Sequence, residues 1–236
     1  MNNLTEEIRK KKEFRELPVS LVERVAGQSK DVKEARATLR KYLTVFLTNK
    51  VVSGKLGAEE VLSKHISSKD RDYPELYHRI IGKEDIIFDL GAGANGFSYK
   101  YIGKKYVAIE ATKVLVDLMN KYFEEKRFDA KAVWGDLFDL GFVLDVIGKE
   151  IGSKAIWLFN VIDALELEPN YSKELISAVA EKADRVVLSW PTQSLQKKRK
   201  FAVQRNWIFY FIQNNFRILD NFEMNGEKFV VFNKRT

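Results

Sequence analysis

From residue 83 onward, short apolar runs alternate with segments of helical character, and this alternation constrains the fold more than any other feature of the chain. A parallel strand covered by helices on both faces needs a continuous apolar run, and each run here stops at a glycine, a proline or a polar residue. The runs span residues 85–90, 106–109, 130–134, 155–159 and 185–190. The helical segments between them span residues 112–126, about 138–148 and 172–182. Five such repeats predict an α/β fold with a parallel sheet and right-handed crossovers.

The C-terminal segment has a different pattern. Residues 216–222 and 228–233 are two strand-like runs, and the linker between them contains Asn225-Gly226. This dipeptide is a strong hairpin signal, because both turn positions need a positive φ. The parallel sheet is therefore expected to end in an antiparallel pair, which is unusual for ordinary dinucleotide-binding folds.

Residues 1–80 are predicted to be helical. In residues 31–47 the apolar side chains recur at three- and four-residue spacing, as an amphipathic helix requires, with Ser29 or Asp31 available as its cap. Shorter helices are predicted over residues 17–25, 58–64 and 73–80. The chain is therefore expected to have two parts, a helical N-terminal extension at 1–80 and a sheet domain at 81–236.

The positive charge is unevenly distributed between these parts. The formal net charge is +7, which by itself often reflects solubility alone. Residues 1–80 carry 17 basic and 12 acidic side chains, whereas residues 81–236 carry 23 and 21. One further basic cluster, Lys197, Lys198, Arg199 and Lys200, follows the fifth predicted strand. Both places are candidates for contact with phosphate groups, although a solvated charge run is the alternative for the cluster.

Composition excludes several classes of site. The 236 residues include no Cys and only two His, so a disulfide framework, a Cys-ligated metal and a thiol nucleophile are excluded, and no metal site is expected. No apolar run approaches the roughly 18 residues of a membrane span. The charged start of the chain has no apolar stretch behind it, so no secretory signal is expected. We expect a cytoplasmic monomer without a membrane partner, and the many Lys and Glu are typical of a thermophilic source.

The first predicted strand ends in a glycine-containing loop, Asp89-Leu90-Gly91-Ala92-Gly93. In an open α/β sheet, ligands bind at the carboxyl ends of the strands, and glycine lets the backbone approach them closely. Glu110, about 20 residues on at the end of the second strand, is placed where a ribose-binding carboxylate belongs. This pattern favours a nucleotide-like cofactor. A tight turn without a ligand and an NAD site are the alternatives, and the glycine spacing argues against NAD.

Asp-x-Gly-x-Gly followed by an acidic second strand resembles the S-adenosyl-L-methionine site of class I methyltransferases. The resemblance implies a Rossmann-like sheet of seven mostly parallel strands whose last strand is antiparallel. It also implies that Asp89, Gly91 and Gly93 lie near the methionine part and that Glu110 binds the ribose hydroxyls. Asp136 would accept from the adenine amine, with Leu137 packed on the ring. The alternative for Asp136 is a cap for the following helix.

Three further segments, at residues 65–71, 158–166 and 189–195, resemble the aminoglycoside-resistance 16S ribosomal RNA methyltransferases (the ArmA, Rmt, Sgm and FmrO group). The most specific match is Ser-Trp-Pro-Thr-Gln-Ser-Leu, which begins at Ser189. The resemblance implies methylation of guanine N7 in small-subunit RNA, with a helical extension at 1–80 that docks on RNA. A lid over the cofactor with ordinary surface charge is the alternative for this extension. It makes Arg71 the candidate for binding the cofactor carboxylate, and Ser189, Trp190 and Asn160 the candidates near the target base. For Arg71, a salt bridge to Asp70 or Asp72 is the alternative.

Guanine N7 chemistry suits this sequence, because N7 has an in-plane lone pair and no proton to lose. The enzyme would need to align the base with the methyl group and would need no strong general base. The chain also lacks the Asn-Pro-Pro-Tyr element used for exocyclic amines and the Cys used for carbon-5 methylation. Direct transfer to a ring nitrogen is therefore expected.

The sequence also departs from the family pattern. Lys69, Asn160 and Leu167 replace family residues, and the basic cluster at 197–200 replaces a glycine-rich loop. Two other functions therefore stay open, a methyltransferase for a small molecule or protein and a non-catalytic RNA-binding module. His65 is a candidate for ligand contact or for simple packing. The aromatic residues at 207–211 are candidates for base stacking, but most of them are expected on a buried helix face, and Trp207 is the best candidate for exposure.

Overall fold

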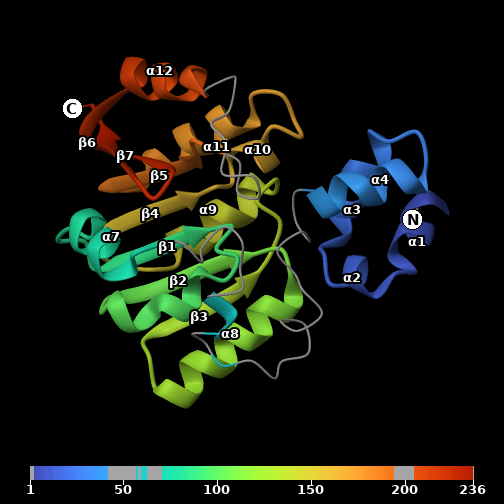
Figure 1. Cartoon of the computed structure of the whole chain (residues 1–236), viewed down its shortest axis with the longest axis horizontal. Coiled ribbons are helices and arrows are strands. Elements are labelled where there is room, and N and C mark those ends of the chain that lie inside the picture. Colours follow the sequence, from blue (N-terminus) through green and yellow to red (C-terminus); the bar gives the residue numbers. More distant parts are fainter. Residues whose placement is uncertain (1–2, 42–56, 58–59, 63–70, 194–204, 236) are drawn as a thin grey trace.

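One seven-stranded sheet forms the body of the molecule (Figure 1). The computed structural model describes residues 3–41, 57, 60–62, 71–193 and 205–235. The strand order is β3-β2-β1-β4-β5-β7-β6. The strands are β1 (Ile86–Leu90), β2 (Lys105–Glu110), β3 (Ala130–Trp134), β4 (Lys154–Phe159), β5 (Arg185–Pro191), β6 (Phe216–Met224) and β7 (Glu227–Lys234).

Strands β1 to β5 pair in parallel, whereas β7 runs antiparallel to β5, and β6 runs antiparallel to β7. The predicted fold class is therefore confirmed, including the hairpin at the end of the sheet. Asn225 and Gly226 both have positive φ, at 52° and 78°, as the Asn-Gly turn signal requires. The strand order reverses at β1, since β2 and β3 lie on one side of it and β4 on the other. In open α/β sheets, ligands bind in the crevice outside the carboxyl ends of the strands at such a reversal.

Helices cover both faces of the sheet (Figure 1). The helical elements that follow the N-terminal four are α7 (Tyr73–Ile80), the 3-10 helix η2 (Asn95–Tyr101), α8 (Lys113–Lys126), α9 (Leu140–Gly148), α10 (Ile162–Leu165), α11 (Tyr171–Ala180) and α12 (Asn206–Asn215). One core cluster joins the sheet to α7, η2 and α8, and a second joins it to α9, α10, α11 and α12. The pattern of residues 73–80 predicts a helix of the N-terminal extension, but α7 packs on the sheet through buried Leu76, Tyr77 and Ile80.

The N-terminal helices form a small unit with its own core. They are α1 (Asn3–Arg9), α2 (Lys12–Arg15), α3 (Val19–Gly27) and α4 (Val32–Leu39). Their apolar side chains form a separate cluster, against which Ala111 and Leu167 of the sheet domain pack. Asp31 caps α4 by accepting a hydrogen bond from the backbone N–H of Glu34, so the predicted start of this helix is correct. The rest of the predicted helix, from residue 42, lies outside the described residues, as do residues 58–59 and 63–64 of the next one.

The N-terminal unit docks beside the carboxyl edge of the sheet. The backbone N–H of Lys113 donates to the carbonyl of Glu16 at 2.9 Å. The indole N–H of Trp134, at the end of β3, lies 2.7 Å from the carbonyl of Ala111 and 3.2 Å from that of Glu16. Arg24 of α3 forms an ion pair with Glu168, and its guanidinium lies over the ring of Phe138, 4.7 Å from the ring centroid.

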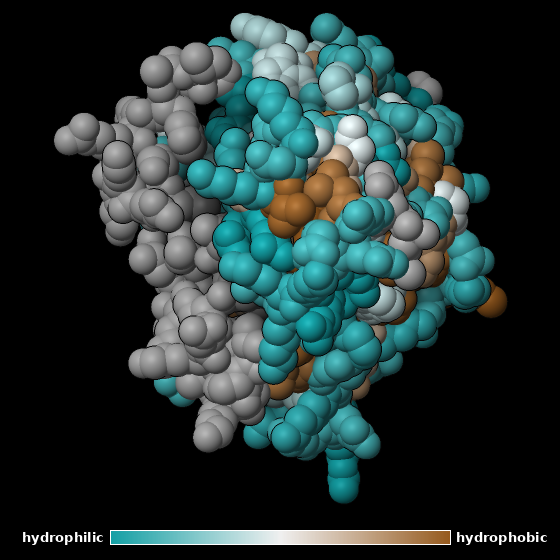
Figure 2. All heavy atoms as spheres, turned by 90° about the vertical axis from the view of Figure 1, so that its right-hand side faces the viewer, coloured by the Kyte–Doolittle hydropathy of each residue, from teal (hydrophilic) through white to brown (hydrophobic). Residues whose placement is uncertain are grey.

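The surface on the side of the N-terminal helices is mostly hydrophilic, with small hydrophobic patches (Figure 2). In the described part of the chain, no helix is both long and apolar enough to cross a membrane.

Candidate cofactor and active site

The loop after β1 is built around glycines in the left-handed conformation. Gly91 has φ +73° and Gly93 has φ +54°. The backbone N–H groups of Gly91 and Ala92 both donate to the carbonyl of Ile109, at 2.8 and 3.1 Å, which holds the loop against the end of β2. A Cβ atom on Gly91 would lie 2.5 Å from Cγ1 of Val161, closer than any real contact of that kind. The loop therefore needs glycine at this position for both its φ angle and its packing.

We expect Gly91→Ala to lower the free energy of unfolding by about 2–4 kcal/mol. The left-handed conformation alone costs a non-glycine residue about 1–2 kcal/mol, and the overlap with Val161 adds to this. Gly103→Ala is the matched control, because Gly103 has φ +63° and open space around it. Urea unfolding of both variants checks the prediction. Equal losses in the two variants would show that Val161 does not constrain the loop.

Asp89, the predicted cofactor-binding residue at the end of β1, is completely buried. Its Oδ2 accepts hydrogen bonds from the hydroxyl of Tyr106 at 2.7 Å and from the amide of Asn95 at 2.6 Å. Its Oδ1 is also buried and has no hydrogen-bond partner among the described residues. A buried carboxylate oxygen without a donor is costly, which points to a ligand group that donates to it.

Burial raises the pKa of Asp89 to about 6, against the lowering effect of the hydrogen bonds from Tyr106 and Asn95 and of the Arg71 charge. Glu110 also contributes to the increase, because a second carboxylate nearby disfavours the charged form. A carboxyl group with a raised pKa at a cleft is a feature of functional sites.

Glu110 lies at the end of β2 and is 8% exposed. One carboxylate oxygen accepts from the backbone N–H of Gly93 at 2.9 Å, and the other accepts from that of Thr112 at 2.8 Å. These bonds fix the carboxylate beside the glycine loop. Burial raises the pKa of Glu110, and the backbone hydrogen bonds of Thr112 and Gly93 limit that rise.

Asp136 follows β3 and is 5% exposed. Its Oδ1 accepts from the backbone N–H of Phe138 at 3.0 Å, and its Oδ2 accepts from the hydroxyl of Ser20 on α3 at 2.8 Å. It does not cap the following helix, because Asp139 holds that position and accepts from the N–H of Phe142. Leu137 is partly buried, and its carbonyl accepts from the hydroxyl of Tyr171. The contact with Ser20 brings the N-terminal unit to the predicted adenine-binding carboxylate.

Arg71 lies at the same edge of the sheet, and it forms an ion pair with Glu227. Of the two alternative partners, Asp72 instead caps α7, and Asp70 lies outside the described residues. The guanidinium donates from Nε to Oε2 at 2.9 Å and from Nη2 to Oε1 at 2.8 Å. The side chains are 7% and 9% exposed, so the pair is buried. Burial favours a lower pKa for Arg71, but the charge and hydrogen bond of Glu227 outweigh it and the pKa is raised. Arg71 is therefore charged at every accessible pH.

The pair connects the two halves of the site. Nη1 of Arg71 lies 3.4 Å from Oδ1 of Asn95, the same residue whose amide group donates to Asp89. On the other side, the buried hydroxyl of Ser189 donates to Oε1 of Glu227. A continuous chain of polar contacts thus runs from Asp89, near the end of β1, to Ser189, near the end of β5.

The three residues predicted to lie near the target base, Asn160, Ser189 and Trp190, do not all face the same side of the sheet. The Asn160 backbone N–H donates to the carbonyl of Ser189 at 3.1 Å, its φ is 57°, and its Oδ1 is buried without a partner in the described part of the chain. Trp190 is 6% exposed and belongs to the core that includes Ile208 and Ile212 of α12. Successive strand residues point to opposite faces, so Ser189 and Trp190 do not line one pocket together.

Several predicted site residues fall outside the described residues. They are His65, Lys69 and the basic cluster Lys197, Lys198, Arg199 and Lys200. Downstream of that cluster, Trp207 is 38% exposed, as predicted, and Lys173 lies 5.4 Å from its ring centroid. Tyr210, at 58%, is even more exposed. Across the described ranges, no group of His, Cys, Asp and Glu side chains is arranged to hold a metal ion.

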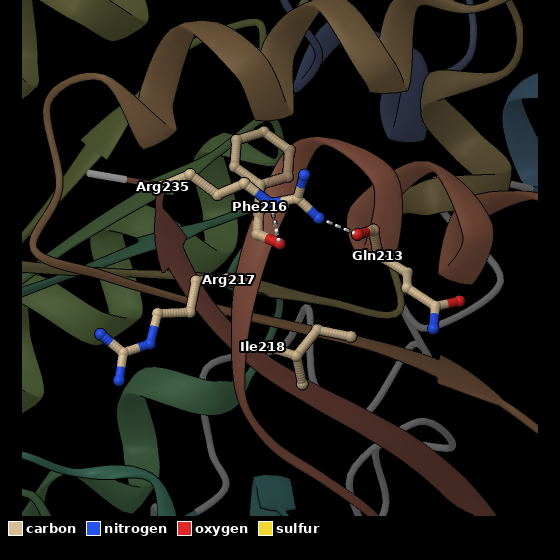
Figure 3. A pocket seen from close by; sticks show the side chains of 5 residues that line it. All are labelled: Gln213, Phe216, Arg217, Ile218 and Arg235. Atoms are coloured by element: carbon tan, nitrogen blue, oxygen red, sulfur yellow. Dashed lines mark hydrogen bonds between the residues drawn. The ribbon is translucent and has the colours of Figure 1, made fainter.

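A hollow of about 460 Å³ lies between the end of α12 and β6, and none of the candidate site residues lines it (Figure 3). Its lining residues are Gln213, Phe216, Arg217, Ile218 and Arg235. Arg235 is held across it by hydrogen bonds to the carbonyls of Phe216 and Gln213. In the hairpin, Phe216 of β6 pairs with Lys234 of β7. Phe232, two residues earlier in β7, pairs with Val186 near the start of β5, so Lys234 lies beyond the amino end of β5. The hollow is therefore at the amino end of the parallel strands, opposite to the glycine loop.

Comparison with known proteins supports the fold along the whole chain. No protein-family model matches the sequence, and no curated protein matches it either. Solved structures do match: the 16S rRNA methyltransferase RmtF in complex with S-adenosyl-L-homocysteine is 18% identical, with a TM-score of 0.78 and coverage of 100% of both chains. The 16S rRNA methylase RmtB is 21% identical, with a TM-score of 0.75 and coverage of 99% of this chain and 98% of that one. An rRNA methylase from Escherichia coli is 21% identical, with a TM-score of 0.77 and coverage of 99% of both. This chain therefore has the class I methyltransferase fold, which it shares along its length with these three proteins.

Proposed function

We propose that this protein is an S-adenosyl-L-methionine-dependent methyltransferase that acts on small-subunit ribosomal RNA, with guanine N7 as the target. The observation that carries the proposal is the polar network from Asp89 to Ser189, because it gathers one buried arginine and buried carboxylates at the crevice of the sheet. The likeness to RmtF, which was crystallised with S-adenosyl-L-homocysteine, supports the same cofactor class for this chain.

The buried groups match the chemistry of this cofactor. The unpartnered Oδ1 of Asp89 suits the donor hydrogens of an amino group. Arg71 keeps donors that are not used by Glu227, and these suit a carboxylate. Each oxygen of Glu110 accepts one backbone hydrogen bond and retains a lone pair for a ribose hydroxyl. Asp136 and Leu137 are the candidates for the adenine amine and ring.

When bound, S-adenosyl-L-methionine supplies an electrophilic methyl group. Guanine N7 has its lone pair in the base plane and no proton, so the protein needs only to orient the base. The Ser189 hydroxyl donates to Glu227 and is therefore suited to positioning rather than to nucleophilic attack. The unpartnered Oδ1 of Asn160 is an acceptor suited to the N–H groups of a guanine.

The N-terminal unit is the proposed docking surface for RNA. Lys11, Lys12, Lys30 and Lys33 are all exposed on it. Phosphate contacts of this kind position a protein on RNA without reading sequence, and they weaken as salt increases. The basic cluster at 197–200 is proposed as a second RNA contact. We further propose that the protein is cytoplasmic and monomeric. Light scattering measures the molar mass in solution and so tests the monomeric state.

Calorimetry with S-adenosyl-L-methionine, followed by transfer of a labelled methyl group to RNA, tests the proposal. We expect saturable binding and label in RNA from purified small subunits, with none in large subunits. Label on a protein or on a small molecule would support the alternative methyltransferase function. Tight binding without transfer to any subunit would support a non-catalytic RNA-binding module.

Cofactor affinity is expected to fall as the pH is lowered through about 6. The bound amino group favours the ionised form of Asp89, whose pKa burial has raised to about 6, so binding below that pH must first remove a proton. The affinity is therefore complete above this range and falls by up to about tenfold per pH unit below it. Glu110, whose pKa is also raised, acts in the same direction. Calorimetry between pH 5 and pH 8 measures the effect, and an affinity that is constant or rises toward pH 5 would contradict it.

A further inference from the structure

Glu227 is a buried carboxylate that the cofactor contacts proposed above do not use. It is the first residue of β7, directly after the Asn225-Gly226 turn, and it is paired with Pro191 of β5. It is one of the few charged residues that are buried in the described part of the chain. The turn thus delivers a negative charge to the carboxyl end of β5, next to the candidate active site.

The geometry of the ion pair leaves one side of Arg71 available. Glu227 takes the side-on pair of donors, Nε at 2.9 Å and Nη2 at 2.8 Å. A guanidinium has five N–H donors in a rigid plane, and the end-on pair formed by Nη1 and the second hydrogen of Nη2 points in a different direction. The one described contact of Nη1 is the 3.4 Å distance to Asn95, which is long for a hydrogen bond. The end-on donors of Arg71 are therefore suited to a second carboxylate.

Two other contacts fix this arrangement. The ring of Phe159, at the end of β4, lies beside the guanidinium, with its centroid 5.1 Å from Cζ of Arg71. The Ser189 hydroxyl donates to Oε1 of Glu227, so the carboxylate itself is held from the β5 side. Phe159 supports the plane of the guanidinium, and Glu227 sets its rotation within that plane. Without Glu227, nothing among these contacts would determine which donor pair faces the crevice.

We propose that Glu227 is a positioning residue of the cofactor site, which orients Arg71 so that its end-on donors bind the α-carboxylate of the cofactor. This inference rests on the proposed function, since it assigns the ligand of Arg71 to the amino-acid part of S-adenosyl-L-methionine. The role is one of geometry, because Glu227 itself does not touch the ligand. It explains why a glutamate is buried at the start of an antiparallel strand, where an apolar residue would pack at lower cost.

Two ligands separate positioning from a merely structural role. S-Adenosyl-L-homocysteine carries the α-carboxylate, and 5′-methylthioadenosine has the same nucleoside and thioether without it. We expect Glu227→Gln to weaken binding of the first by about tenfold to 100-fold, the range typical of residues that orient a ligating group, and to change binding of the second by less than about twofold. Glu223→Gln is the matched control, because Glu223 lies on the same hairpin but is exposed and bonds to Thr192. It is expected to change neither affinity.

Each result of the calorimetric titration has a defined meaning. Equal weakening of both ligands would show that Glu227 only supports the fold, and unchanged binding of S-adenosyl-L-homocysteine would show that Arg71 needs no orientation; either result overturns the inference. Wild-type protein that binds neither ligand would overturn the proposed function itself. If Glu227→Gln does not fold, the ratio of the two affinities is measured in Glu227→Asp, which keeps the charge but shortens the side chain. In Glu227→Asp we expect the affinity for S-adenosyl-L-homocysteine to fall selectively as well, but by a smaller factor than in Glu227→Gln.

Discussion

Asp89→Asn is expected to weaken S-adenosyl-L-methionine binding by about 100-fold while making the ligand-free protein more stable at pH 8. The variant removes the charge that the amino group of the cofactor would meet, and a buried hydrogen bond between charged groups contributes about 3 kcal/mol. The ligand-free protein gains because the native state disfavours the ionised carboxylate. Burial moves the pKa of Asp89 from its ordinary 3.8 to about 6, a difference of about 3 kcal/mol above pH 6.

The sign of the stability effect follows from proton linkage. Between pH 4 and pH 6 the native state binds more protons at Asp89 than the unfolded state, so stability falls as the pH rises through this window and stays lower above it. Asparagine removes this dependence and retains an acceptor for Tyr106 and Asn95. After the cost of burying its amide, we expect a net gain of about 1–2 kcal/mol, which corresponds to about 2–4 °C per kcal/mol for a chain of this size. Thermal unfolding at pH 4 and pH 8 measures it, and a variant less stable than wild type at pH 8 would contradict the account of Asp89.

Arg71→Ala is expected to lower the free energy of unfolding by about 3–5 kcal/mol, because it leaves the buried Glu227 carboxylate without its partner. The double variant Arg71→Met with Glu227→Leu is expected to recover most of that loss, since apolar side chains of similar size replace a buried ion pair at little cost. It is not expected to recover cofactor binding, because the carboxylate-binding donors are gone. Urea unfolding and calorimetry on the same samples separate the two effects. A double variant as unstable as Arg71→Ala would mean that the pair itself, rather than the unpaired charge, determines stability.

Much of the fold could be predicted from sequence because buried parallel strands are encoded locally. The apolar run at 85–90 ends at Gly91, and β1 is Ile86–Leu90, one residue shorter. The Asn225-Gly226 dipeptide correctly predicts the position of the hairpin, since few other dipeptides adopt a positive φ at both residues. The assignment of α7 to the N-terminal part had a different cause. Helical periodicity shows that residues 73–80 have an apolar face, but it does not show which core that face joins.

The candidate site was predictable only where each residue lies at, or just after, the carboxyl end of a strand. Asp89, Glu110 and Asp136 have that position, and the parallel sheet brings all three to one edge. The partner of Arg71 was not predictable, because Glu227 is 156 residues away and looks in the sequence like an ordinary charged residue of the hairpin linker. Ser20 was missed for the same reason, since its contact with Asp136 spans 116 residues. Pairings of this kind depend on how separate segments dock, which strand and helix patterns do not contain.

The central claim, methylation of guanine N7 in small-subunit RNA, is tested most directly by chemical scission at 7-methylguanosine. RNA from small subunits incubated with the protein and S-adenosyl-L-methionine is reduced with borohydride and treated with aniline, which cuts the chain where N7 is methylated. We expect one new cut in the 16S RNA that requires the cofactor and is absent with Asp89→Asn at low cofactor concentration. Labelled RNA that resists scission would contradict the account, because the methyl group would then be on another atom.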